Sequence, residues 1–426
     1  MWLRSTALAV FAAVSCLSAS AQSPETLTLD EAFTRVAQSH PDLRLIEGRR
    51  SVLSAELERA SVTRGLSAGF GVENALGTGE ASGFKQAEIT LTLAGVLERG
   101  GKLDARRTLA QSRIDALAVQ REIKRLDLLA EVARRYLAVN AAQEQHRIAE
   151  QDVAQRKRTV AGAKQRLDAG ASPESVVFTA QAAQARAEME RDRAQQRGVA
   201  ARQHLAALWG ERNPAFDVVA GNPLMLPDIA AFVELDAVLA TTPELARFAD
   251  EQRIGEARIQ LARSQATPDL DWQVGVRRLQ ASDDYALIGS VSLPLGSARR
   301  AQPELRAAEA ELALVGIERE AQGLSLYSTL AEAHGRYLVS QLEVGRMQSD
   351  VLPKLAKAES AAERAYRGGA ISYLEWAQLQ SERTNARKQQ LEAALDAQRA
   401  LIEIQRLTGQ AFVASPASQT NQETTP

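Results

Sequence analysis

Thr90-Leu91-Thr92-Leu93 and Ser290-Val291-Ser292-Leu293 decide the fold, because one alternation of polar and apolar residues occurs twice at an offset of about 200 residues. The breaks between helices repeat at a similar offset, since Gly170-Ala171 corresponds to Gly369-Ala370. Self-similarity at a long, nearly fixed period indicates one supersecondary unit used twice. We therefore predict two structural repeats that build one body with pseudo-two-fold symmetry.

Alternation with period two, which is typical of β-strands, occurs in two segments of each repeat. The first repeat is predicted at 22–220 and the second at 221–410, with strands at about 66–73, 86–93, 270–277 and 285–293. These segments are close to the ~9 to 11 residues that a tilted strand needs to cross a bilayer. A half-buried hairpin on a soluble protein is the other interpretation that alternation alone allows.

Four strands are too few for a membrane barrel, since single-chain barrels begin at about eight strands. An open sheet edge in lipid leaves unpaired backbone groups, each of which costs several kcal/mol. If these strands enter a membrane, several chains must share one barrel. Apolar positions such as Leu91 and Val274 would then face lipid, while polar positions such as Thr90 and Gln273 would face the lumen.

Long helices are predicted after each strand pair. Residues 102–167 contain no proline and one glycine, while apolar residues recur at helical spacing. A helix of about 65 residues is roughly 100 Å long, which is too long for a compact globule. The predicted helical hairpins lie at about 102–209 and 303–407, the second opening with one helix from about 303 to 367, and shorter helices precede them near 29–62 and 233–265. The expected fold is mainly α with a small β part.

The two hairpin turns carry the residues that end and restart helices. In Asp168-Ala169-Gly170-Ala171-Ser172-Pro173 we expect glycine as the C-terminal cap, serine as the N-cap and proline at the first helical position. The second turn is predicted at Gly368-Gly369, with the returning helix starting at Ser372.

The two ends of the chain are predicted to lie outside this body. Residues 1–21 have the charge, apolar core and Ala19-Ser20-Ala21 ending of a secretory signal peptide, so the mature chain is expected to begin at Gln22. The apolar run is shorter than the roughly 20 residues of a spanning helix, which is the competing interpretation. Cys16, the one cysteine, would be removed, although its lipidation stays open. The polar segment 411–426 is expected to be disordered.

Several classes of function are disfavoured. With 51 basic and 53 acidic residues, the chain lacks the cationic excess of nucleic-acid-binding proteins. No hydrolase, phosphate-loop or zinc-protease motif occurs, so we expect neither enzymatic activity nor a cofactor. The four histidines are scattered without metal-ligand spacing, and we expect no metal site: His40, His146, His204 and His334.

Over about 27–409 this organisation resembles the TolC-type outer membrane efflux proteins. Within them, Leu97-Glu98-Arg99-Gly100-Gly101-Lys102 is similar to the Glu-Leu-Gly-Gly-Lys segment of the CzcC-like branch, which serves heavy-metal efflux of the RND type. Arg99 stands where that branch has leucine, and Pro294-Leu295-Gly296-Ser297-Ala298-Arg299-Arg300 stands where it often has Phe-Asp-Arg-Asn.

The resemblance implies a homotrimer in outer membrane lipid, with a twelve-stranded β-barrel continued by an α-helical barrel through the periplasm. It also implies a passive conduit that receives substrates, in this branch heavy-metal cations, from a periplasmic adaptor (a membrane fusion protein) and an inner-membrane RND pump. A channel for drug efflux or type I secretion is the alternative within the family, because the sequence does not identify the substrate, pump or adaptor. A periplasmic adaptor or a coiled-coil scaffold is the alternative from another class.

The resemblance further implies that the adaptor docks at the hairpin tips, 167–175 and 366–374. The candidate contact residues are Gly170, Ala171, Ser172, Arg367, Gly369, Ile371 and Ser372. Capping alone explains the glycines and serines but does not require Ile371 or Tyr373. The family's periplasmic gate corresponds to Glu375 and Gln378, whose first-repeat equivalents are Val176 and Thr179. Alternatively, Glu375 only complements the helix dipole.

Overall fold

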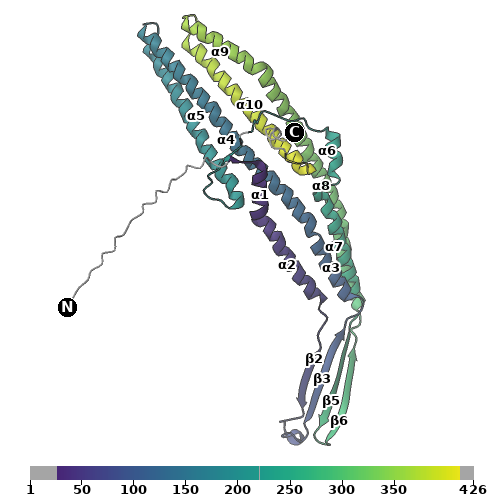
Figure 1. Ribbon diagram of the computed structural model, residues 1–426. Helices are drawn as coiled ribbons and strands as arrows, with labels where there is room; N and C mark the ends of the chain where they lie inside the picture. Colours follow the sequence, from purple (N-terminus) through teal and green to yellow (C-terminus); the bar gives the residue numbers. More distant parts are fainter. Residues whose placement is uncertain (1–25, 220, 413–426) are drawn as a thin grey trace, which may run out of the picture.

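The computed structural model describes residues 26–219 and 221–412, so the predicted signal peptide and nearly all of the predicted tail lie outside it. The molecule is elongated, with a β-sheet at one end and paired helix tips at the other (Figure 1). Among the helices of the described residues, none carries an apolar stretch long enough to cross a membrane.

The order of elements repeats, as predicted. The first repeat contains β1 (Thr26–Leu27), α1 (Leu29–Ser39), α2 (Pro41–Ser61), β2 (Ser67–Glu73), β3 (Glu88–Leu97), α3 (Lys102–Asp115), α4 (Leu117–Asp168) and α5 (Glu174–Ala206). After β4 (Asp217–Val218), the second contains α6 (Phe232–Leu239), α7 (Pro243–Gln265), β5 (Leu270–Leu279), β6 (Asp284–Ser292), α8 (Ser297–Arg346), α9 (Leu352–Arg367) and α10 (Tyr373–Thr408). A mainly helical fold with a four-stranded sheet is thus confirmed.

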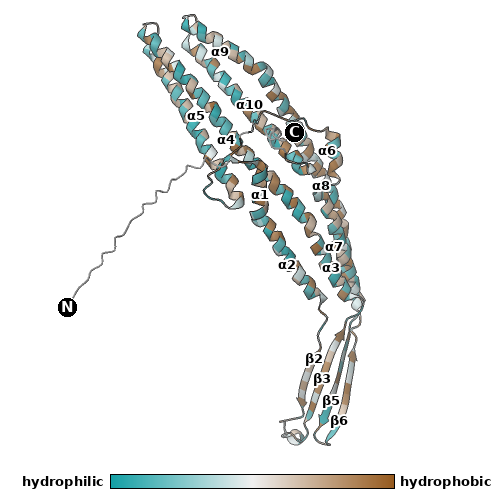
Figure 2. Ribbon diagram, viewed as in Figure 1, coloured by the Kyte–Doolittle hydropathy of each residue, from teal (hydrophilic) through white to brown (hydrophobic). Residues whose placement is uncertain are grey.

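The sheet joins the two repeats in the antiparallel order β2-β3-β5-β6, so β2 and β6 are its outer strands. Its register collects apolar residues on one face: Phe70, Leu91, Val276 and Leu287 form one row across the four strands, and all four are exposed. The next row lies on the opposite face of the sheet and consists of Gly71, Thr90, Arg277 and Ala286. Figure 2 shows this mixture of apolar and polar positions along the strands.

The largest difference from a predicted strand boundary is at the end of β3. β3 ends at Leu97 rather than near 93, because its last residues pair with the start of β5, down to Leu97 opposite Leu270. Gly95 permits this close pairing, since a Cβ at that position would approach the Trp272 ring to 2.9 Å.

The helices are also more divided than predicted. The expected helix at 29–62 is broken at His40, because Pro41 starts α2, and Pro243 likewise starts α7. The long helix after Gly101 is interrupted at Ala116.

In the second repeat, α8 begins at Ser297, six positions before the predicted start at 303, and it contains Pro303. The predicted single helix to 367 is divided by a π-helical turn at Met347–Val351. Pro353 explains this turn, because proline lacks an N–H and its ring clashes with the carbonyl four residues earlier.

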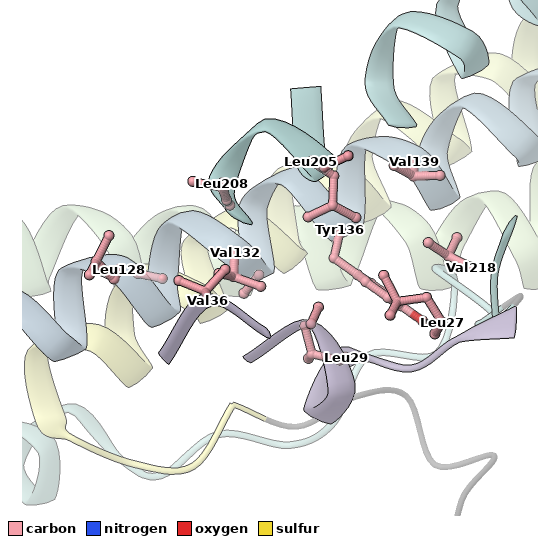
Figure 3. Packing of buried hydrophobic residues seen from close by; sticks show 14 of the residues in the cluster. Leu27, Leu29, Val36, Leu128, Val132, Tyr136, Val139, Leu205, Leu208 and Val218 are labelled. Carbon is pink, nitrogen blue, oxygen red and sulfur yellow. Dashed lines mark hydrogen bonds between the residues drawn. The ribbon is translucent and has the colours of Figure 1, made fainter. Parts of the chain in front are cut away.

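Two buried tyrosines hold the middle of the molecule together. The Tyr136 hydroxyl of α4 donates to the carbonyl of Leu27 at 3.0 Å, and the surrounding apolar cluster joins α1, α4, α5 and the β1–β4 pair (Figure 3). At the equivalent place in the second repeat, the Tyr337 hydroxyl donates to the carbonyl of Pro227. Burial raises the pKa of both phenols to about 12, so both are neutral donors at physiological pH.

Candidate functional site

The tips at 167–175 and 366–374, called tip 1 and tip 2 below, end their first helices in the same way. Gly170 and Gly369 adopt left-handed φ angles of 69° and 77°. At each tip the glycine N–H and the next N–H donate to carbonyls of the last helical turn, at 2.8 to 3.0 Å. This is the glycine cap that the sequence predicts at both positions.

The returning helices start differently. Ser372 is the N-cap of α10, and its hydroxyl and the Glu375 side chain form a reciprocal capping box. At tip 1, the prediction of Ser172 as N-cap was wrong: Pro173 occupies the N-cap position without a side-chain bond, and α5 begins at Glu174. Ser172 therefore lies one position before the N-cap and does not cap the start of α5, and Pro173 lies before the first helical position and not at it.

Glu375 is tied to tip 2 by its own helix start. Its carboxylate accepts from the Ser372 N–H at 2.8 Å and from the Ser372 hydroxyl at 2.9 Å. The backbone and side-chain bonds from Ser372 lower the Glu375 pKa, so this exposed carboxylate is ionised at neutral pH. Gln378, the other gate candidate, is exposed and donates to Glu382 at 3.1 Å. In the first repeat, Val176 is half-buried and Thr179 is exposed.

The docking candidates differ in accessibility. Gly170, Ala171, Arg367, Gly369 and Ser372 are exposed, whereas Ser172 and Ile371 are half-buried. Ile371, although a docking candidate, packs against the apolar cluster between the tips and is not freely exposed.

Tyr373 is buried and is therefore not available for docking. It belongs to an aromatic cluster of tip 2 in which the Tyr366 ring stacks on Trp376 with centroids 5.0 Å apart, while Tyr373 lies edge-on to Tyr366 at 6.2 Å. These rings pack against Val160 and Val177 of the first hairpin. The cluster therefore fixes tip 2 against tip 1.

Arg166 of α4 makes the polar part of this joint, and sequence reasoning missed it. Its guanidinium lies 4.8 Å above the Tyr366 ring and donates to the carbonyls of Tyr366 and Arg367 at the end of α9. It also donates to the carbonyl of Ala171 in its own tip at 3.1 Å. A cation among carbonyls at a helix C-terminus is favoured by the helix dipole.

A buried polar layer lies further from the tips. Arg156 of α4 donates to the Gln380 side-chain oxygen at 3.3 Å and to the Ser381 hydroxyl at 3.0 Å in α10. Thr159 and Gln380 exchange hydrogen bonds beside it. In the described ranges, no group of three metal-binding side chains comes together. The contacts of Arg156, Thr159 and Gln380 join α4 to α10.

The outer membrane efflux protein family matches this chain over residues 36–211 and 235–410, once in each repeat. These matches cover far more than half of the chain, so the chain belongs to that family. It is a non-enzymatic outer membrane efflux channel of the TolC type that extends into the periplasm.

Individual relatives agree with this assignment. The chain is 29% identical over 314 residues to the cobalt-zinc-cadmium resistance protein CzcC of Cupriavidus metallidurans, covering 74% of this chain and 75% of the relative. The crystal structure of CusC matches with a TM-score of 0.74 at 18% identity, covering 89% of this chain and 91% of that one. VceC of Vibrio cholerae matches with a TM-score of 0.70 at 17% identity, covering 90% and 97%.

Proposed function

We propose that three copies of this chain form a passive conduit that receives heavy-metal cations from a periplasmic adaptor and an RND pump. The similarity to a cobalt-zinc-cadmium resistance protein supports the metal cargo. The sheet would lie in the outer membrane and the tips in the periplasm. After removal of residues 1–21 the sequence has no cysteine and three methionines, so the chain itself would pass metal without sequestering it.

The sheet edges support the trimer. In lipid the outer strands β2 and β6 need partners, and pairing β6 of one copy with β2 of the next would leave no edge in a ring of three. The same contact would cover an exposed apolar stripe of α8, formed by Leu314, Ile317 and Leu324, with Leu45 and Val52 of the neighbouring α2. Apolar side chains would then complement each other along both edges.

Cysteine crosslinking in cells tests this closure. Ser290→Cys in β6 is combined with Ser67→Cys or Gly71→Cys in β2, where a side chain at Gly71 meets open space. At least one pair is expected to give covalent dimers and trimers, while Ser290→Cys alone gives only monomers. Absence of intermolecular crosslinks, together with a monomeric mass in detergent, would contradict the trimer.

Accumulation assays test the cargo. In the source bacterium, deletion of this chain should raise cellular zinc, cobalt or cadmium while leaving the retention of organic dyes unchanged. Dye retention without metal accumulation would instead favour drug efflux, and loss of an exported protein would favour type I secretion.

Docking of the adaptor is proposed at the exposed part of the tips, formed by Ala171, Arg367 and Ser372. Arg367→Asp is the cleaner test, because its partner Glu363 lies on the same exposed helix face and such pairs contribute little to stability. We expect loss of adaptor crosslinking and of export with normal trimer yield, and no effect from Arg197→Asp on α5. Crosslinking that survives in Arg367→Asp would remove this residue from the docking surface.

Gating by a ring of three Glu375 carboxylates is also proposed, because like charges near one axis attract passing cations. Glu375→Gln is well suited to the test, since glutamine also completes a capping box and the helix start is kept. In planar bilayers the wild type should be cation-preferring and blocked by divalent cations from the periplasmic side, and the variant should lose the block. An unchanged block would leave Glu375 with its capping role alone.

A further inference from the structure

A cavity of about 330 Å³ lies between α4, α9 and α10, beside the buried polar layer described above. Three arginines line it: Arg158 of α4, and Arg383 and Arg387 of α10. Arg383 and Arg387 are four residues apart on one helix, which places both side chains on the same face. The cavity is therefore bordered by guanidinium groups from two helices.

Two carboxylates, Asp152 and Glu359, also line the cavity, and one of the three arginines, Arg383, is paired with a carboxylate. The Asp152 carboxylate lies 3.3 Å from the guanidinium of Arg156, which does not line the cavity. The Glu359 carboxylate lies 2.6 Å from the guanidinium of Arg383. Arg158 and Arg387 donate hydrogen bonds to neutral glutamine oxygens, of Gln155 and Gln151 respectively. Two positive charges at the cavity thus remain without a carboxylate partner within the described part of the chain.

The environment of Arg387 shows the consequence of this imbalance. Burial, and then repulsion by the nearby Arg383 and Arg147, lower the Arg387 pKa, and the attraction of Glu359 does not compensate. Arg147 is itself paired with Glu144. A guanidinium that is half-buried among like charges is stabilised by any anion that can reach it.

We propose that this cavity binds a small oxyanion of the phosphate or sulfate class, held by Arg387 with Arg158 and Arg383. The planar guanidinium donates two parallel N–H groups that match two oxygens of such an anion. Gln151 is a further polar side chain of the cavity lining, whereas the Thr384 hydroxyl donates to Asp152 at 3.2 Å. The bound anion would connect α4 to α10 beside the Glu359–Arg383 pair. This site is independent of the cargo that the channel carries.

Calorimetry on the purified mature chain in detergent tests the site with sodium phosphate and sodium sulfate, at ionic strength matched with sodium chloride. We expect saturable binding of one anion per chain. Arg387→Gln should weaken it by at least about tenfold, because charge-assisted hydrogen bonds are lost. Arg197→Gln, which removes an exposed arginine from α5, is the matched control and should bind like the wild type.

Glu359→Gln provides a second, opposite test. It removes the carboxylate that occupies Arg383, so anion binding should tighten by roughly tenfold. The proposal is overturned if the wild type shows no saturable binding, as when a carboxylate of a neighbouring copy fills the cavity. It is also overturned if Arg387→Gln binds as tightly as the wild type, or if Glu359→Gln leaves the affinity unchanged.

Discussion

Arg166 is the residue on which the relative position of the two tips depends most directly. It belongs to the first hairpin, yet two of its hydrogen-bond acceptors, the carbonyls of Tyr366 and Arg367, belong to the second. Ala365 holds the equivalent position in the second repeat, counted from Gly369, so no matching arginine works in the opposite direction. The joint between the tips is therefore asymmetric although the turns are alike.

Arg166→Met should loosen tip 2 while leaving both hairpins folded. Methionine keeps contact with the Tyr366 ring but loses the donors to the α9 carbonyls, which should cost about 1 to 3 kcal/mol at this partly exposed site. Hydrogen exchange should be faster at 366–374, with no change in Arg186→Met on the exposed face of α5. Equal exchange in both variants would mean that the aromatic cluster alone holds the tip.

At the scale of elements, the sheet offers the clearest test of membrane placement. Leu91 is 61% exposed in the apolar row, so Leu91→Arg should cost roughly 2 to 4 kcal/mol if that face contacts the bilayer midplane. Gln273→Arg on the other face should be mild. Thr90 is a poorer control than the sequence suggests, because it is buried and accepts a hydrogen bond from Arg277 at 3.1 Å. Heat stability of the assembled protein checks both variants, and equal losses would contradict the assignment of the faces.

The π-helical turn before α9 should depend on Pro353. With Pro353→Ala the missing N–H returns and a regular helix can form across 347–351, so amide exchange there should slow by at least about tenfold. Pro303→Ala, inside the regular part of α8, should change exchange only near its own position. Unchanged exchange at 347–351 would show that tertiary packing, and not proline, maintains the turn.

These elements also show what sequence can reveal. The four sheet strands were predictable because each of their faces meets one environment, which gives a period of two. The β1–β4 pair was not, because strands of two residues carry no period. The glycine turns were predictable from local chemistry, whereas the contact of Arg156 with Gln380 joins residues 224 positions apart and leaves no local mark. Tyr366 and Trp376 meet across a turn, where helical periodicity is interrupted.

At the scale of the whole molecule, one ion-pair cluster joins both repeats and the sheet to the helices. The Lys102 ammonium at the start of α3 is buried and lies 2.7 Å from Asp269, just before β5. Asp269 also accepts from the Arg99 N–H at 3.2 Å, and Gly100 approaches Thr267 so closely that a Cβ there would meet it at 2.6 Å. The Gly-Gly-Lys motif of the first repeat thus contacts the second repeat directly before β5.

Asp269 should make this joint sensitive to acid. Burial alone would raise the Asp269 pKa, but the hydrogen bonds from Lys102 and the Arg99 N–H, with the charges of Lys102 and Arg64, lower it overall. A carboxylate with a lowered pKa stabilises the folded state above its unfolded pKa, and this contribution is lost as pH falls through the folded value. Wild-type thermal stability should therefore decline as pH falls below the ordinary aspartate pKa of about 3.9, and Asp269→Asn should remove that part of the decline.

A double-mutant cycle measures the joint itself at neutral pH. Lys102→Met leaves Asp269 largely buried with its nearest cation removed, so it should be the most destabilising variant, by about 3 kcal/mol. Lys102→Met combined with Asp269→Asn should recover much of that loss, because no uncompensated charge remains. The second repeat has Gly296 before α8 without an equivalent lysine, so Ser297→Met there should be nearly neutral. Additive losses in the double variant would show that Lys102 and Asp269 act separately, and that their ion pair does not join the repeats.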